Sequence, residues 1–357
     1  MADKISIPLR GITCAVLVLA AALLAPSIEA QATAPRYEVD PSWPKPLPDR
    51  WILGGLAGVC VDSQDHVLIL NRQNVVEGDL NAGSLAPLII EFDPEGNVVH
   101  SWGDPDLLDL RLHGCFFDED DNVWIASAPS GMVQKYSHDG ELLFQIGMKG
   151  VFDSSDRTAR GQPLNSDAAR FMSPSDIYVE PITGEIYVAD GEGRGTNRRI
   201  AVMDREGRFL RQWEPEGMET VHCMTGSSDG FIYVCNRENA RMQVYDRQGT
   251  FIRNIDIPWQ PFTPPENGVA QQSGGSAVSV DLSPDSDESL LYVINQNSAR
   301  IEIIDRETGE ILSNFGGSAG QLSGQFNQHH GLAVDSENRV YVTENRGRRV
   351  QRFVVVR

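Results

Sequence analysis

The stretch His330–Arg346, HGLAVDSENRVYVTENR, contains the pattern that decides the fold. An apolar strand ends in an acid, a polar turn follows, and a second apolar strand ends in a loop rich in Asn and Arg. The pattern recurs in His113–Ser127, HGCFFDEDDNVWIAS, and in Ser175–Gly191, SDIYVEPITGEIYVADG. Further alternating strands follow these copies around Asp-x-x-Gly turns, as at 93–96 and 204–207, and such turns between alternating strands are typical of hairpins.

Six such units follow one another, each with four short strands rich in Val, Ile and aromatic residues. Four-stranded units repeated every roughly 45–60 residues predict an all-β fold, a six-bladed β-propeller. The last unit stops after its third strand, and Tyr37–Asp40 offers a candidate fourth strand that would close the ring. Helical periodicity is nearly absent, so residues 33–357 are expected to form a single domain, with 151–170 and 258–275 as long loops.

The N-terminus has the order of a secretory signal peptide. Lys4 and Arg10 precede an apolar run over 11–25, and Ala30-Gln31-Ala32 is a small-x-small cleavage signature. We expect residues 1–32 to be removed and the mature protein to be exported, periplasmic or secreted, without membrane attachment. The apolar run is short for a membrane span, which needs roughly 20 residues, and an uncleaved anchor is the alternative.

The net charge of the chain argues against one class of function, nucleic-acid binding. The chain carries 50 acidic against 30 basic residues, a net charge of −20, which disfavours nucleic-acid binding because phosphate backbones are repelled. A monomer that acts on a small molecule or peptide is expected.

Cys60, Cys115 and Cys223 lie on expected buried strands, where a free thiol behaves as a small apolar residue. Cys223 and Cys235 flank one hairpin and are the one candidate disulfide.

Three histidines occupy one repeat position on alternate blades. Five residues before the position aligned with the acid that ends the first strand stand Ala57, His113, Ser175, His222, Ser276 and His330. First strands line a propeller channel, and alternate blades of six stand about 120° apart, so three imidazoles converge on the axis. Three imidazoles with one open position are a catalytic zinc arrangement. We therefore predict a zinc site, although a lone histidine is more often a hydrogen-bonded structural residue.

The other histidines are expected to lie elsewhere. His329 should face away from His330, and His66, His100 and His138 should be surface residues near turns or strand ends.

Fifteen residues after the repeat position stand Arg72 and Arg237, in loops at the same mouth of the channel. Guanidinium groups suit a carboxylate or a developing oxyanion, and ordinary surface charge is the alternative. The run Arg346, Arg348, Arg349 is expected to be a solvated loop.

The segments 113–127, 221–239 and 328–345, with the intervening 162–191, resemble NHL-repeat propellers and, among these, peptidyl-α-hydroxyglycine α-amidating lyase. The resemblance covers the whole mature chain. It implies zinc held by His113, His222 and His330, with Arg72 and Arg237 beside the metal. It also implies cleavage of a peptidyl-α-hydroxyglycine into a peptide amide and glyoxylate.

The chain departs from that family at three places. Glu192 replaces the tyrosine proposed as the family's base, and a glutamate can serve as a base instead. The family's calcium, bound by carbonyls matching Val59 and Cys115, also uses an aspartate that is Gly331 here. The family's two disulfides lack partners, since Gly193 replaces one cysteine.

Two other functions remain open from the sequence. A non-catalytic NHL propeller would bind a ligand or protein partner in the cell envelope through a loop face. A calcium propeller of the lactonase type would need carboxylate and Asn side chains in the channel, where Ala, Ser and His stand.

Overall fold

The computed structural model describes residues 1, 34–128, 130–152, 170–193, 195–259 and 275–356. The predicted signal peptide therefore lies outside the described residues apart from Met1, as do most of the two expected long loops. None of the helices in the described part of the chain has the length and apolar character to cross a membrane.

The described residues between 36 and 356 contain six four-stranded antiparallel sheets, which confirms the predicted all-β fold with six propeller blades. The first three blades are β3 (Leu56–Val61), β4 (Val67–Asn71), β6 (Ile89–Phe92) and β7 (Val98–Trp102); β8 (Leu112–Phe117), β9 (Val123–Ser127), β10 (Met132–Tyr136) and β11 (Leu142–Gly147); and β12 (Pro174–Val179), β13 (Ile186–Asp190), β14 (Arg199–Met203) and β15 (Phe209–Trp213).

The other three blades are β16 (Val221–Gly226), β17 (Phe231–Asn236), β18 (Arg241–Asp246) and β19 (Phe251–Asp256); β20 (Ala277–Leu282), β21 (Leu290–Asn295), β22 (Arg300–Asp305) and β23 (Ile311–Gly316); and β24 (His329–Val334), β25 (Val340–Glu344), β26 (Arg349–Val356) and β1 (Arg36–Val39). Outside the blades, the described residues form a parallel pair, β2 (Trp51–Ile52) with β5 (Ser84–Leu85), and four 3-10 turns, η1 (Pro48–Arg50), η2 (Glu77–Asn81), η3 (Arg237–Asn239) and η4 (Gln296–Ser298).

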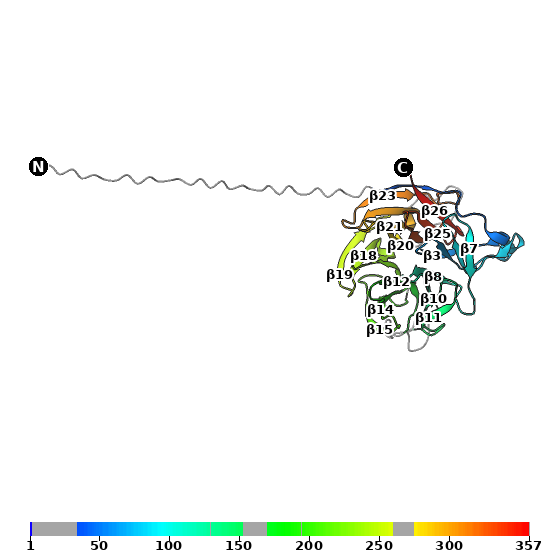
Figure 1. Ribbon diagram of the computed structural model, residues 1–357, viewed down its shortest axis with the longest axis horizontal. Coiled ribbons are helices and arrows are strands. Elements are labelled where there is room, and N and C mark those ends of the chain that lie inside the picture. Colours follow the sequence, from blue (N-terminus) through cyan, green and yellow to red (C-terminus); the bar gives the residue numbers. More distant parts are fainter. Residues whose placement is uncertain (2–33, 129, 153–169, 194, 260–274, 357) are drawn as a thin grey trace. The chain divides into compact units, whose positions relative to one another are not determined.

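The first strand of each blade lies innermost and contacts the first strand of the next blade. These contacts run β3–β8–β12–β16–β20–β24, and β24 contacts β3, so the ring is closed. Figure 1 shows the first strands around the centre and the fourth strands, such as β7, β11, β15 and β19, at the rim. Side chains at the start of a first strand are therefore placed to meet on the axis.

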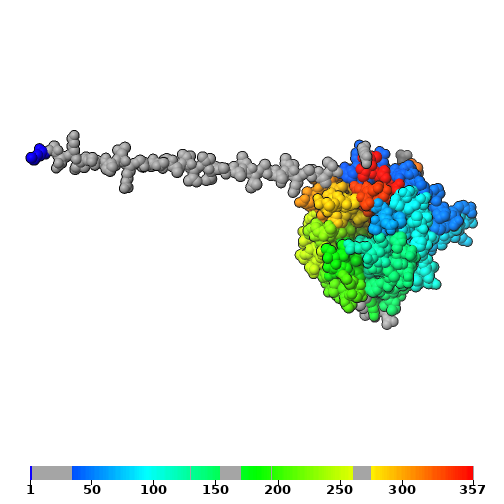
Figure 2. Space-filling model, in the orientation of Figure 1, coloured from blue at the N-terminus to red at the C-terminus, as the bar shows by residue number. Residues whose placement is uncertain are grey.

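The N-terminal strand β1 completes the last blade, as the sequence predicted for this segment. It pairs antiparallel with β26, with Tyr37 opposite Val355, and Figure 2 shows the two chain segments side by side, in blue and red. Trp43, only 4 % exposed, packs beyond this strand in the core between the last and first blades. The two ends of the propeller thus support each other.

The hydrophobic core is divided into six clusters, one for each pair of neighbouring blades. Because side chains of a strand alternate between two faces, each blade contributes to the cluster on either side of it. Tyr187, Tyr233 and Tyr341, from the second strands of three blades, are almost completely buried in these clusters. Packing between blades therefore fixes the backbone that carries the axial residues.

Both cysteine pairs form disulfides: Cys223–Cys235 is the candidate that the sequence offered, whereas Cys60–Cys115 corrects the expectation of free buried thiols. Cys60 and Cys115 join the first strands of blades one and two, with Cα atoms 5.9 Å apart, and Cys223 pairs with Cys235 across one hairpin, at 5.1 Å. The Cys60–Cys115 pair could not be predicted from the sequence, because the two residues meet only where neighbouring blades pack.

A candidate metal centre at the propeller axis

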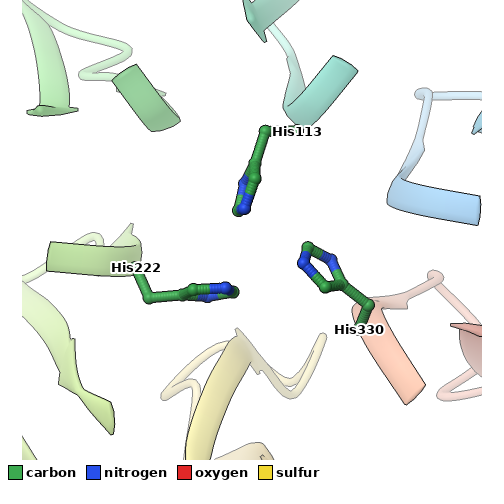
Figure 3. Close-up of side chains that lie close together, drawn as sticks. All are labelled: His113, His222 and His330. Carbon is green, nitrogen blue, oxygen red and sulfur yellow. The ribbon is translucent and has the colours of Figure 1, made fainter. Parts of the chain in front are cut away.

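Three histidines meet at the propeller axis. His113, His222 and His330 are each the second residue of a first strand, in β8, β16 and β24. Each of these strands departs from regular antiparallel register beside its histidine, and such an irregularity changes the direction of a side chain. Figure 3 shows the three imidazoles pointing toward one common centre from three sides.

The imidazoles are close enough to share one ion. Their ring centroids lie 4.7–5.1 Å apart, and one nitrogen of each lies within 4.8 Å of the others. The three rings are not stacked, with interplanar angles of 61–71°. This arrangement lets each nitrogen direct its lone pair inward.

Backbone carbonyls of the intervening blades orient two of the rings. The Nδ1 atoms of His113 and His222 lie 2.8 Å from the carbonyl oxygens of Ser175 and Val278. A carbonyl only accepts, so Nδ1 carries the proton and Nε2 is left with its lone pair. Nε2 of His113 is buried and has no hydrogen-bond partner among the described residues. These two carbonyls were not anticipated, because backbone groups leave no residue signature.

Burial keeps the imidazoles neutral. It lowers the pKa of His113 to about 4, assisted by Arg72 and Arg237 and opposed by Glu192. Burial also lowers the pKa of His222 and of His330 well below the ordinary value. Metal binding requires unprotonated imidazole, so the three ligand nitrogens are available at neutral pH. The donor set and its orphaned nitrogen fit zinc or a similar divalent ion.

Glu192 reaches the same centre from the loop after β13. Its Oε2 atom lies 3.8 Å from Nε2 of His113 and 3.7 Å from Nε2 of His222. This oxygen is buried and has no hydrogen-bond partner among the described residues. Burial opposes ionisation of the carboxyl, but the two histidines and the arginines outweigh it and lower the pKa of Glu192 to about 2. The carboxylate is therefore ionised at neutral pH and lies beside the histidines.

The two predicted arginines lie around this carboxylate. An Nη1 atom of Arg237 is 4.0 Å from Oε2 of Glu192, and its Nη2 is 3.1 Å from the neighbouring Glu238. Arg72 donates from Nε to the carbonyl of Leu112 at 3.0 Å. Burial lowers the pKa of Arg72 to about 10, and Glu192 opposes this change. The structure thus brings all six predicted site residues together, while their roles stay predictions.

A cavity of about 240 Å³ extends along the channel on the other side of the histidines. It is lined by Val59, Cys115 and two partly buried carboxylates, Asp176 and Asp281. An aspartate at Gly331 would not fit, because an added Cβ would lie 2.5 Å from the carbonyl of Ala57. Calcium at Val59 and Cys115 stays a prediction, and any carboxylate ligand there would have to come from other residues.

Other histidines and arginines that the sequence placed outside the site lie away from the three axial histidines. His329 stacks on Phe326, with ring centroids 4.5 Å apart, and faces away from the axis as predicted. Arg348 and Arg349 form ion pairs with Asp79 and Glu344, away from the three histidines. His66 and His138, predicted as surface residues near turns, are partly exposed and also meet in a second cluster with two acids. Their sequence distance of 72 positions hid this contact.

Comparisons with known proteins agree with the repeated-blade architecture. No protein-family model matches the chain. NHL repeat-containing protein 3 from Homo sapiens is 28% identical over 335 residues, which cover 89% of this chain and 84% of that protein. Peptidyl-glycine alpha-amidating monooxygenase B from Xenopus laevis is 25% identical over 84% of this chain, which spans only 34% of that longer protein.

Solved structures of lyases share the fold. Virginiamycin B lyase from Staphylococcus aureus, in complex with quinupristin, has a TM-score of 0.52 at 15% identity and covers 89% of this chain and 85% of its own. A streptogramin B lyase has a TM-score of 0.53 at 14% identity, over 90% and 98%. Such low identity supports the architecture alone. With the repeated blades and the relatives together, the chain is a six-bladed β-propeller of the NHL-repeat type.

Proposed function

We propose that the protein is a zinc-dependent lyase that cleaves an α-hydroxyglycine-type substrate into an amide and glyoxylate. One observation carries this proposal: three neutral imidazoles share a centre whose surroundings include two arginines and one carboxylate. The similarity to alpha-amidating monooxygenases supports it, because 25% identity extends over 84% of the chain. We further propose that the protein is an exported monomer, and its two disulfides suit an oxidising compartment.

His113, His222 and His330 would hold the metal, and their nitrogens within 4.8 Å of one another fit that role. When bound, zinc would act as a Lewis acid that polarises an oxygen of the substrate. The hydrogen bonds from Nδ1 to Ser175 and Val278 fix two of the rings. Such support from outside the ligand set orients the ligands and raises their basicity.

Arg72 and Arg237 would bind the substrate carboxylate. Both stand at the mouth of the channel beside Glu192, and the 4.0 Å between Arg237 Nη1 and Oε2 of Glu192 is compatible with a carboxylate close to this guanidinium. A guanidinium presents a rigid fork of donors that matches a carboxylate. These contacts would hold the α-carbon, with its hydroxyl, next to the histidines.

Glu192 would accept the hydroxyl proton and return it to the amide nitrogen as the carbon–nitrogen bond breaks. The hydroxyl carbon becomes the aldehyde carbon of glyoxylate, the bonding pair leaves with nitrogen, and the proton completes the amide, so the step balances without a co-reactant. The oxygen of Glu192 that would take the proton has no hydrogen-bond partner among the described residues, which leaves it free to accept one.

The test combines metal analysis with turnover. Purified protein, dialysed extensively, should retain a near-stoichiometric metal at the axis and release glyoxylate from α-hydroxyhippurate. His222→Ala should lose both properties, while His100→Ala, which changes a histidine far from the axis, should keep both. Folded protein whose metal content is the same with and without His222 would overturn the proposal.

A second function is favoured by the place of Glu192. Its Oε2 lies 3.7–3.8 Å from two ligand nitrogens, near the vertex that a substrate oxygen would need. A carboxylate that closes the coordination sphere would make the site structural. The chain would then be a non-catalytic propeller that binds a ligand or protein partner in the cell envelope. Bound metal without any glyoxylate release would favour this function.

A further inference from the structure

A second group of possible metal ligands lies at the junction of the first two blades. Asp62 and His66 bracket the turn between β3 and β4, Glu91 lies in β6, and His138 belongs to the turn between β10 and β11. One ligand atom of each lies within 4.8 Å of the others. Three of these residues come from blade one and the fourth from blade two.

This cluster lies at the opposite end of the strands from the axial site. In β3, Leu56 pairs with Asn71, next to Arg72 at the mouth, whereas Val61 pairs with Val67 beside Asp62. The two centres therefore share no residue. The second cluster requires its own explanation.

Four of the six distances between ligand atoms in the cluster are close to those of a tetrahedral site. His66 Nδ1 lies 3.4 Å from Asp62 Oδ2 and 3.2 Å from Glu91 Oε1. His138 Nε2 lies 3.1 Å from each of the same two oxygens. Four ligands at zinc-like bond lengths of about 2.0–2.2 Å would be roughly 3.3–3.6 Å apart around a tetrahedral ion. Only a small expansion would be needed to admit the ion.

Glu91 provides an independent indication of a missing partner. Its side chain is 1 % exposed, and neither of its carboxylate oxygens has a hydrogen-bond partner among the described residues. Burying a charge without hydrogen bonds is costly unless a cation compensates it. The imidazoles beside it compensate only when protonated, whereas a divalent cation would do so at any pH that leaves the ligands unprotonated.

The neighbouring backbone holds Asp62 in a ligating orientation. Its Oδ1 accepts the backbone N–H groups of Gln64 and His66 at 2.9 and 2.7 Å. Its Oδ2 is left to face His66 and His138. One oxygen thus orients the carboxylate, and the other points into the cluster. Carboxylates that bind metals commonly have one oxygen held by hydrogen bonds and the other free to bind the ion.

We infer that Asp62, His66, Glu91 and His138 bind a second divalent transition-metal ion, with zinc as the best match. Two imidazoles and two carboxylates suit zinc and its neighbours, whereas calcium takes oxygen ligands alone. Four protein ligands complete a tetrahedron, so the site is structural and leaves no position for a substrate. The ion ties the β10–β11 turn of blade two to blade one.

Zinc titration of chelator-stripped full-length protein by equilibrium dialysis tests this inference. The wild-type protein should bind two zinc ions, and His138→Ala should bind one. Affinity at the second site should weaken on the order of 100-fold or more, because loss of a direct ligand costs more than loss of a residue that only orients a ligand. The half-exposed His138 lies in a turn, so its replacement should preserve folding. His100→Ala is the control, since His100 Nδ1 lies 3.9 Å from the other oxygen of Glu91.

Glu91→Gln, which keeps size and removes charge, serves as the second variant if His138→Ala does not fold. Loss of one zinc ion in either variant, with retention in His100→Ala, supports the site. Equal zinc binding by the wild type and by a folded His138→Ala or Glu91→Gln protein would overturn it. His222→Ala should remove only the axial ion, and His138→Ala should remove only the second ion. The zinc content of these two variants therefore shows separately whether each site binds metal.

Discussion

Glu192→Gln is the substitution that tests the proposed chemistry most directly. It keeps the shape of the side chain and removes the charge that lies 3.7–4.0 Å from two histidines and Arg237. The three histidines are unchanged and keep their mutual distances. We therefore expect the axial metal to be retained, while the proton acceptor of the proposed reaction is lost.

The size of the effect follows from the surroundings of the carboxylate. A positioned general base contributes about 10²–10⁴-fold to the rate, and the contribution is greatest when its pKa is near the working pH. The histidines and arginines outweigh burial and lower the pKa of Glu192 to about 2, which makes it a weak base. We expect kcat to fall about 10²-fold, which corresponds to about 3 kcal/mol.

The assay is glyoxylate release from α-hydroxyhippurate, with the metal content of each sample measured in parallel. Glu238→Gln is the matched control, because Glu238 pairs with the same Arg237 at 3.1 Å but has no ion pair with the histidines. Its kcat should stay within about twofold of wild type, a change worth less than about 0.5 kcal/mol. A Glu192→Gln enzyme that retains its metal and full kcat refutes the role of this carboxylate as base.

Three further predictions concern the channel, the ring closure and the mouth. Burial raises the pKa of Asp176 to about 7, above its unfolded value. The folded state then holds the proton longer, and stability falls as pH rises from about 4 to about 7. Asp176→Asn should flatten this fall in urea unfolding, and an unchanged pH slope contradicts the assignment. Trp43→Ala should cost about 3–5 kcal/mol of unfolding free energy, because the ring is 4 % exposed in the closing core; a loss as small as that of exposed Ser42→Ala contradicts this. Arg237→Ala should raise the KM of a carboxylate-bearing substrate about 10–100-fold, the value of a charged hydrogen bond, and an unchanged KM would exclude the carboxylate contact.

The fold and the axial histidines could be predicted because repetition makes equivalent positions visible. Once the blades are aligned, His113, His222 and His330 occupy one position, and the geometry of a closed ring places that position on the axis. The N-terminal strand around Tyr37 was found by the same reasoning, because the last repeat lacks a fourth strand. Each of these predictions needs only the order of elements within a blade.

Contacts between blades could not be predicted in this way. Cys60 and Cys115 occupy different positions in their repeats, and they meet because the first strands of neighbouring blades pack against each other. His138 contacts Asp62 because the β10–β11 turn of blade two lies against the β3–β4 turn of blade one. The sequence signal that could have pointed to this junction is Glu91, an acid in a strand of otherwise apolar residues.

The possible ligands of the axial site differ in how firmly each is held, and this difference bears on function. The axial rings of His113 and His222 are fixed by strand backbone and by carbonyls 2.8 Å from Nδ1. Glu192 is instead a loop residue, whose backbone N–H bonds to the carbonyl of Ser173 at 2.9 Å. Its carboxylate has no hydrogen-bond partner at Oε2 among the described residues. Rotation about its side-chain bonds can therefore withdraw the carboxylate while the histidines stay in place. A fourth position held by such a side chain is exchangeable, which is the property that a catalytic metal site needs and a structural site lacks.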